Sequence, residues 1–252
     1  MKYSFITILL VFIALIFTNC GKQSAVEEGL PYSAYIARAN QYHNENKDEK
    51  AIPYYKKALE IKPAAGDVHY ILGEIYDSEY KKSYDSAWKQ HSFDVLTHRK
   101  PNEFYIKGDT KELEKYGLKK EYKELAMQEF RQTIKYEPQN WMARYRVASD
   151  LLSKQQYKEA IQEYEKVIEL NPKYVNAYSL MGEAYMKEGS LDLAVKWIKK
   201  ALELDTNSEY DYYNLGLVYR KMLNGDEFNK VLAKLKSMHS FFYDELRLSI
   251  YR

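Results

Sequence analysis

The sequence has few cysteines, little net charge and few long hydrophobic segments, and each of these shortages excludes a class of protein. It has one cysteine among 252 residues, so an internal disulfide is excluded and packing alone must hold the fold. Its formal net charge is +2, with acidic and basic residues interleaved, which argues against the broad basic face of a nucleic-acid-binding protein. Apart from one run near the amino terminus, it has no long hydrophobic segment. With 46% hydrophobic and 29% charged residues, it has enough apolar material for a globular core.

The single apolar run, Phe5 to Phe17, follows Lys2 and has the length of a signal-peptide core. It falls short of the roughly 20 apolar residues that a bilayer-spanning helix needs. The segment FTNC that ends at Cys20 resembles the lipobox of bacterial lipoproteins, although its phenylalanine and asparagine depart from the commonest choices. The resemblance implies a signal peptide at 1–19, lipidation of Cys20, and a tether at 20–31. An uncleaved anchor helix and an ordinary signal with an unrelated cysteine are the alternatives.

A lipid on Cys20 would hold the mature chain on a membrane surface, because two or more acyl chains anchor a protein stably. We therefore expect a bacterial membrane-anchored lipoprotein at the outer membrane, facing the periplasm, with the cell surface as the alternative.

Small residues recur along the rest of the chain at one fixed spacing. The positions of Ala148, Gly182 and Gly216 differ by 182 − 148 = 34 and 216 − 182 = 34, and those of Ala39 and Gly73 differ by 73 − 39 = 34. An aromatic residue or a leucine follows each of them by three positions. This pattern resembles the tetratricopeptide repeat family over about residues 32 to 242. The resemblance implies an all-α, right-handed solenoid of antiparallel helix pairs, closed by a C-terminal capping helix.

Elementary packing agrees with this resemblance. Tyr178, Met181, Gly182 and Tyr185 share one helix face, and Gly182 is small enough for two helices to meet closely. One helical hairpin cannot bury its own apolar face, so the units must stack. The predicted domain is 32–252, with units near 32–65, 66–106, 107–140, 141–174, 175–208 and 209–242.

The repeat register breaks once. The positions of Gly73 and Ala148 differ by 148 − 73 = 75, which is seven more than two repeats would occupy. Ala87 resembles the small residue of a second helix, which predicts a hairpin over 66–106 with an insertion at about 88–107. The next unit, 107–140, is degenerate because Glu114 occupies its small-residue position. Residues 228–252 remain apolar at helical spacing and predict one long closing helix.

We expect no catalytic centre, metal or cofactor in such an array. His91, Asp94 and His98 share a helical face and are the candidate ligands of a remote alternative, a metal-binding envelope enzyme. The interpretation as a solvated helix surface is favoured, because no third strong ligand lies nearby.

The resemblance places ligand contacts at positions two, five, nine and twelve of each first helix, on the concave face. A carboxylate clamp is not expected, because Ile36 occupies the lysine position that should accompany Asn40. For each tyrosine, packing against the next repeat is the alternative. The candidate partner-binding residues are Asn40, Tyr70, Glu74, Asp77, Tyr145, Ser149, Glu183 and Tyr213. A rival surface on the insertion contains His98, Arg99, Lys100, Phe104 and Tyr105.

The sequence thus predicts a lipid-anchored, non-catalytic scaffold that binds a protein or peptide partner at the bacterial envelope. In anchor and repeat architecture it is also similar to two assembly lipoproteins, a subunit of the outer-membrane β-barrel assembly machine and the pilotin of type IV pilus secretins. A role as a subunit of such a machine is the alternative.

Overall fold

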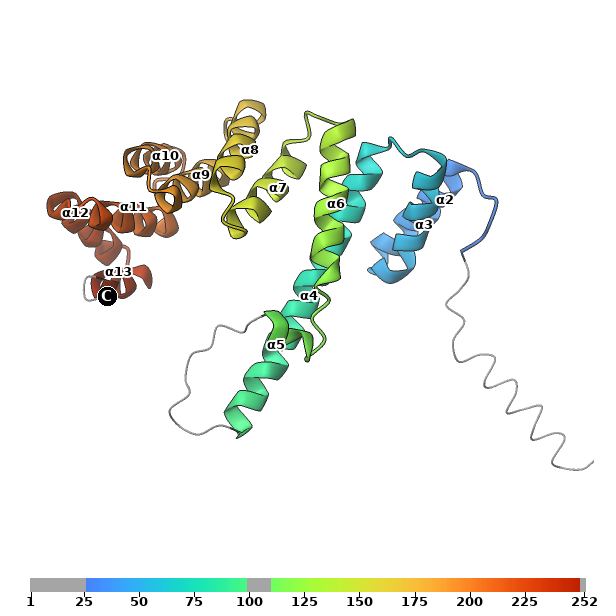
Figure 1. Ribbon diagram of the computed structural model, residues 1–252, viewed down its shortest axis with the longest axis horizontal. Coiled ribbons are helices and arrows are strands. Elements are labelled where there is room, and N and C mark those ends of the chain that lie inside the picture. Colours follow the sequence, from blue (N-terminus) through green and yellow to red (C-terminus); the bar gives the residue numbers. More distant parts are fainter. Residues whose placement is uncertain (1–25, 99–109, 250–252) are drawn as a thin grey trace, which may run out of the picture. The chain divides into compact units, whose positions relative to one another are not determined.

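A computed structural model describes residues 26–98 and 110–249 (Figure 1). Every regular element in those ranges is a helix, which confirms the all-α prediction. The chain divides into two compact units, Met1–Pro63 and Ala64–Arg252, and each is described by itself. The expected signal peptide and Cys20 lie outside the described residues. Within the two described ranges, no helix is long and apolar enough to cross a bilayer.

The first unit is a helical hairpin of α2 (Tyr32–Asn44) and α3 (Asp48–Ile61). Ala39 is fully buried where the two helices pack together. The described end of the expected tether, residues 26–31, lies against this hairpin. The Tyr35 hydroxyl donates to the Glu27 carbonyl at 3.0 Å. Any free tether therefore ends before Glu27.

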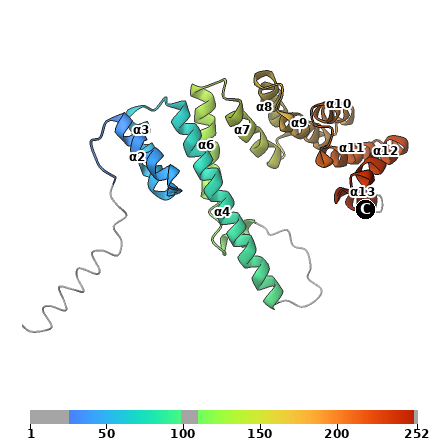
Figure 2. The same ribbon diagram turned by 180° about the vertical axis from the view of Figure 1, so that it is seen from behind.

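The second unit begins with α4 (Gly66–His98), a continuous helix of 33 residues and about 50 Å. The turn expected before Ala87 is absent, so the prediction of a hairpin over 66–106 is wrong. The partner of α4 is α6 (Glu121–Tyr136), which lies beside it in both views (Figures 1 and 2). Gly73 allows this approach, because a Cβ at that position would lie 2.6 Å from a ring carbon of Phe130.

The insertion therefore lies between the two helices of one repeat. The interval from Gly73 to Ala148, 148 − 73 = 75, is one repeat of 34 plus an insertion of 75 − 34 = 41. The prediction of a separate unit at 107–140 is also wrong. Its Glu114 belongs to the short helix α5 (Thr110–Glu114), and its second half is α6, the partner of α4. Ala87 is small because it is fully buried in a cluster with Leu113 and Leu118.

Three regular hairpins follow the insertion. Gln155, Gly189 and Leu223 occupy the same place in their turns, since their positions differ by 189 − 155 = 34 and 223 − 189 = 34, and all have positive φ angles. A Cβ at Gly182 would lie 3.1 Å from the backbone nitrogen of Ile198 in α10, so a small residue does allow these helices to meet closely. The helices are α7 (Trp141–Ser153), α8 (Tyr157–Leu170), α9 (Val175–Glu188), α10 (Leu191–Leu204), α11 (Glu209–Lys221) and α12 (Gly225–Ser237).

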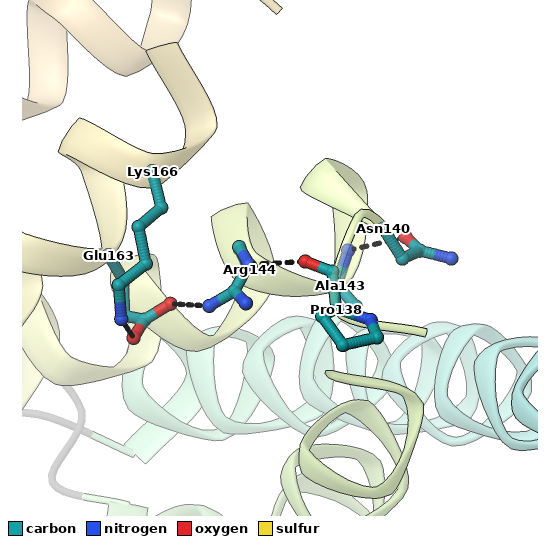
Figure 3. Close-up of polar contacts among 6 residues, drawn as sticks. All are labelled: Pro138, Asn140, Ala143, Arg144, Glu163 and Lys166. Carbon is teal, nitrogen blue, oxygen red and sulfur yellow. Dashed lines mark hydrogen bonds and ion pairs between the residues drawn. The ribbon is translucent and has the colours of Figure 1, made fainter. Parts of the chain in front are cut away.

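Arg144 joins the turn before α7 to helix α8 (Figure 3). Its Nε donates to the Pro138 carbonyl at 2.9 Å, and its Nη1 donates to Glu163 Oε2 at 2.8 Å. Lys166 donates to the other oxygen of Glu163, also at 2.8 Å. Burial acts to raise the pKa of Glu163, but the hydrogen bonds from Lys166 and Arg144 outweigh it and hold that pKa below its usual value. The inserted repeat is thereby fixed to the next one.

The prediction of a single long closing helix at 228–252 is also wrong. Helix α12 ends at Ser237, His239 has a φ of 54°, and the chain starts again as α13 (Phe242–Leu248). Buried Leu246 of α13 packs on Gly216 of α11. Helix α13 contacts both α11 and α12 and so covers the last hairpin, which is the role of a cap.

Candidate partner-binding face

The candidate site is built from the first helices of successive repeats in the second unit, α4, α7, α9 and α11. Helix α9 contacts both α7 and α11 directly. We call the side chains between neighbouring first helices a seam, and name each seam by its two helices.

The α4–α7 seam is held by a compensated charge cluster. Arg146 donates from Nε and Nη2 to the two oxygens of Glu74, both at 3.0 Å. Its Nη1 also lies 3.4 Å from Asp77 Oδ2. Beside them the Tyr70 hydroxyl donates to the Met142 sulfur at 3.6 Å. Burial, assisted by the charge on Glu74, raises the pKa of Tyr70 to about 12, so this hydroxyl stays protonated.

Tyr145 and Ser149 of α7 face the second helix of their own repeat and the turn after it. The ring of Tyr145 meets Tyr174 edge-on, at 5.0 Å between centroids and 87° between planes. Ser149 Oγ and the Tyr164 hydroxyl are hydrogen-bonded at 3.1 Å. Burial raises the pKa of the Tyr164 hydroxyl, and the negative charge on Glu183 of α9 raises it further.

The α9–α11 seam contains two carboxylates, and each accepts a hydrogen bond from a hydroxyl group. The Tyr210 hydroxyl donates to Glu183 Oε2 at 2.5 Å, and the Ser179 hydroxyl donates to Asp211 Oδ2 at 3.0 Å. Asp211 is 1% exposed, and this burial raises its pKa. Its Oδ1 and the Nδ2 of Asn214 are buried with no hydrogen-bond partner.

The remaining two candidates, Tyr213 and Asn40, have partners outside these seams. Tyr213 donates its hydroxyl to Glu245 at 3.0 Å and stacks on Phe242 at 4.9 Å, so helix α13 covers it. Asn40 belongs to the first unit, where it accepts a hydrogen bond from the Tyr55 hydroxyl at 2.6 Å.

Each of the eight candidates thus has a contact within the chain, and the structure joins Glu74 and Asp77 in one cluster. The rival residues Arg99, Lys100, Phe104 and Tyr105 lie outside the described residues. The side chains of His91, Asp94 and His98 are not described either. Among the side chains that the structure does describe, no group of three or more His, Cys, Asp and Glu could hold a metal ion.

Sequence reasoning missed the residues that complete the seams. Arg146 was not selected, because its partner Glu74 is 72 positions away and no local spacing signals that pair. Tyr210 stands at position two of its helix and could have been selected by the same rule that selected Glu183. Asp211 and Asn214 had no signal, because their positions usually face the packing side of the helix.

Comparisons with known proteins agree with this architecture. Models of the TPR repeat match residues 148–189 and 182–222, and a tetratricopeptide repeat model matches residues 32–64. Anaphase-promoting complex subunit 3 of Dictyostelium discoideum is 35% identical over 79 residues, which are 31% of this chain and 8% of that protein.

Solved structures are similar over most of the chain. YrrB, described as a TPR protein with an unusual peptide-binding site, has a TM-score of 0.59 at 22% identity, covering 90% of this chain and 91% of YrrB. MamA from Desulfovibrio magneticus RS-1 has a TM-score of 0.58 at 19% identity, covering 84% of this chain and 97% of that structure. At this identity the likeness concerns the fold alone. The family models thus identify tetratricopeptide repeats at residues 32–64 and 148–222, and the all-helical fold is similar to that of these solved structures.

Proposed function

We propose that this chain is a non-catalytic scaffold that binds a protein or peptide partner through the first helices of its second unit. The observation that carries the proposal is the composition of the seams, where tyrosine, methionine, carboxylate and hydroxyl groups gather at half-exposed positions. Met142 is 41% exposed and Tyr210 is 39% exposed. Rigid aromatic surface beside polar groups is suited to an extended peptide or a partner helix. The peptide-binding site named for YrrB, a structural neighbour, supports the same class of function.

A site-specific photocrosslinking experiment tests this proposal. A benzoylphenylalanine at position 142 or 210 should form a covalent adduct with the partner in intact cells, and mass spectrometry identifies it. The matched controls are Leu193 and Leu204 of α10, which are 41% and 42% exposed but lie on a second helix. Adducts at 193 and 204 with none at 142 and 210 would move the binding surface away from the seams.

We further propose that a lipid on Cys20 holds this scaffold on a bacterial membrane facing the periplasm. The alternative, a role as a subunit of an envelope assembly machine, would be favoured by a partner that belongs to the outer-membrane β-barrel assembly machine or to a type IV pilus secretin.

Replacing Cys20 by serine tests the anchor. Cys20→Ser should prevent acylation, because the chain has no other cysteine, and should leave the protein unprocessed or released. Labelling with a radioactive fatty acid and fractionation after a salt wash measure both effects. A variant that still matures to the mobility of the natural protein and stays on the membrane would refute the lipoprotein assignment.

A further inference from the structure

The α4–α7 and α9–α11 seams have acidic residues at equivalent positions, but only those of the α4–α7 seam are paired with a cationic side chain. Glu74 and Glu183 are each the ninth residue of their helix, counted from Gly66 and Val175. In the α4–α7 seam, the sixth residue of the following first helix is Arg146, which forms ion pairs with Glu74 and Asp77. In the α9–α11 seam, the corresponding sixth residue is Asn214, a neutral amide.

The α9–α11 seam is therefore left with uncompensated negative charge. Neither Glu183 nor Asp211 forms an ion pair with any described residue, and the side-chain hydrogen bonds that these two carboxylates accept come from hydroxyl groups. The Oδ1 of Asp211 and the Nδ2 of Asn214 are buried with no hydrogen-bond partner, and Asn214 stands at the helix position that Arg146 has in the first seam. A buried carboxylate normally has a cationic partner, because an isolated charge is expensive to bury.

Glu183 is accessible to an incoming group. It is half-buried, and the exposed ring of Tyr210 stands beside its carboxylate. A cation bound there would meet the carboxylate directly and lie close to an exposed aromatic ring, which is a favourable surrounding for lysine and especially arginine.

We propose that the α9–α11 seam binds a lysine or arginine side chain of a basic, extended segment of the partner, with Glu183 as its counter-ion and Tyr210 as its aromatic wall. This inference rests on the proposed function and names the chemistry of the partner. The bound cation takes the role that Arg146 has in the α4–α7 seam.

An oriented peptide library tests the inference without knowledge of the partner. The probes are eight-residue peptides with one fixed central residue in a random background, passed over the immobilised full chain. We expect enrichment of peptides with fixed lysine or arginine. Glu183→Gln should reduce that enrichment about tenfold or more, because it removes a charged hydrogen-bond acceptor. Glu203→Gln is the matched control, since it makes the same change at an exposed carboxylate of α10 and should bind as the natural chain does.

Two further variants make the result decisive. Glu183→Lys should reverse the preference toward peptides with fixed aspartate or glutamate. Tyr210→Phe, which keeps the ring and removes the hydroxyl, should keep the preference for cations with a loss of only a few-fold. Circular dichroism and melting must be unchanged in each variant.

The outcomes separate this inference from the proposed function. Retained peptides that prefer acidic or uncharged residues, or a cation preference that Glu183→Gln leaves intact, would overturn the inference and leave the scaffold function standing. Retention of no peptide above the level of blocked resin would count against both.

Discussion

Replacing Gly182 by alanine tests how the repeats are packed. A Cβ added at this position would lie 2.5 Å from Ile198 Cγ1, 3.1 Å from the Ile198 nitrogen and 3.4 Å from the Ala194 carbonyl oxygen. Two of these neighbours are backbone atoms of α10. The Ile198 side chain must move, and the contact with its backbone nitrogen must also lengthen by a few tenths of an ångström, so α9 and α10 move slightly apart.

The size of the effect follows from two opposing contributions. Alanine is favoured over glycine inside a helix by about 1 kcal/mol. Overpacking a core costs about 1–3 kcal/mol, and contact with backbone places Gly182→Ala near the upper end of that range. We expect a net loss of about 1–2 kcal/mol in the free energy of unfolding. For a chain of this size, that loss lowers the melting temperature by about 2–8 °C.

Urea unfolding followed by circular dichroism measures this loss. The control is Gly225→Ala at the start of α12, where nothing lies within 4 Å of an added Cβ. The control should be neutral or slightly stabilising. A Gly182→Ala variant that is as stable as the control would refute the close approach of α9 and α10.

Three further substitutions test other parts of the second unit. Burial raises the pKa of Asp211, so the ionised form of this side chain destabilises the fold. The gain in stability from Asp211→Asn should therefore grow as the pH rises from 4 to 7. A gain that does not depend on pH would contradict this. Leu223 is 92% exposed and has a φ of 57°, a left-handed conformation that asparagine adopts more readily than leucine. Leu223→Asn should therefore raise the stability by up to about 1 kcal/mol. A lower melting temperature would refute this. Arg144→Gln should cost about 1–2 kcal/mol at neutral pH. Because the pKa of Glu163 is lowered in the fold, that cost should shrink as acid protonates Glu163, and chemical denaturation at a series of pH values measures it.

The regular part of the fold could be predicted because its signals are local. A small residue such as Gly182, flanked by large apolar residues at helical spacing, specifies a tight helix crossing wherever it occurs. The constant repeat spacing then places the next small residue, Gly216, although its close neighbour is Leu246 of α13 and not the second helix of its repeat. The sequence therefore predicted both the helical class and the stacking of hairpins after the insertion.

The inserted repeat was misinterpreted because burial of a small residue has more than one cause. Ala87 is buried by α5 and the turn after it, and not by a returning helix. A second signal favoured the continuous helix, since no glycine or proline occurs between Gly73 and Pro101. In the regular repeats the turn residues Asn46, Gln155, Gly189 and Leu223 have positive φ angles, and no residue between Gly73 and Ala87 has one.

The candidate site could be predicted only in part, because its chemistry depends on contacts between repeats. Repeat position placed Glu74 and Glu183 on equivalent faces. Whether each carboxylate is compensated depends on Arg146 and Asn214, which belong to the next first helix. That difference becomes visible only when the register of one repeat on the next is known.

The insertion also affects the order in which the chain folds. The positions of Gly73 and its contact Phe130 differ by 130 − 73 = 57, whereas those of Gly182 and Ile198 differ by 198 − 182 = 16. Loop-closure entropy grows with the logarithm of separation, so pairing α4 with α6 costs about 1 kcal/mol more than pairing α9 with α10. Folding of a repeat array nucleates where pairing is local and then spreads to its neighbours. We therefore expect the nucleus to form among α7 to α12, with α4 and α6 joining it afterwards.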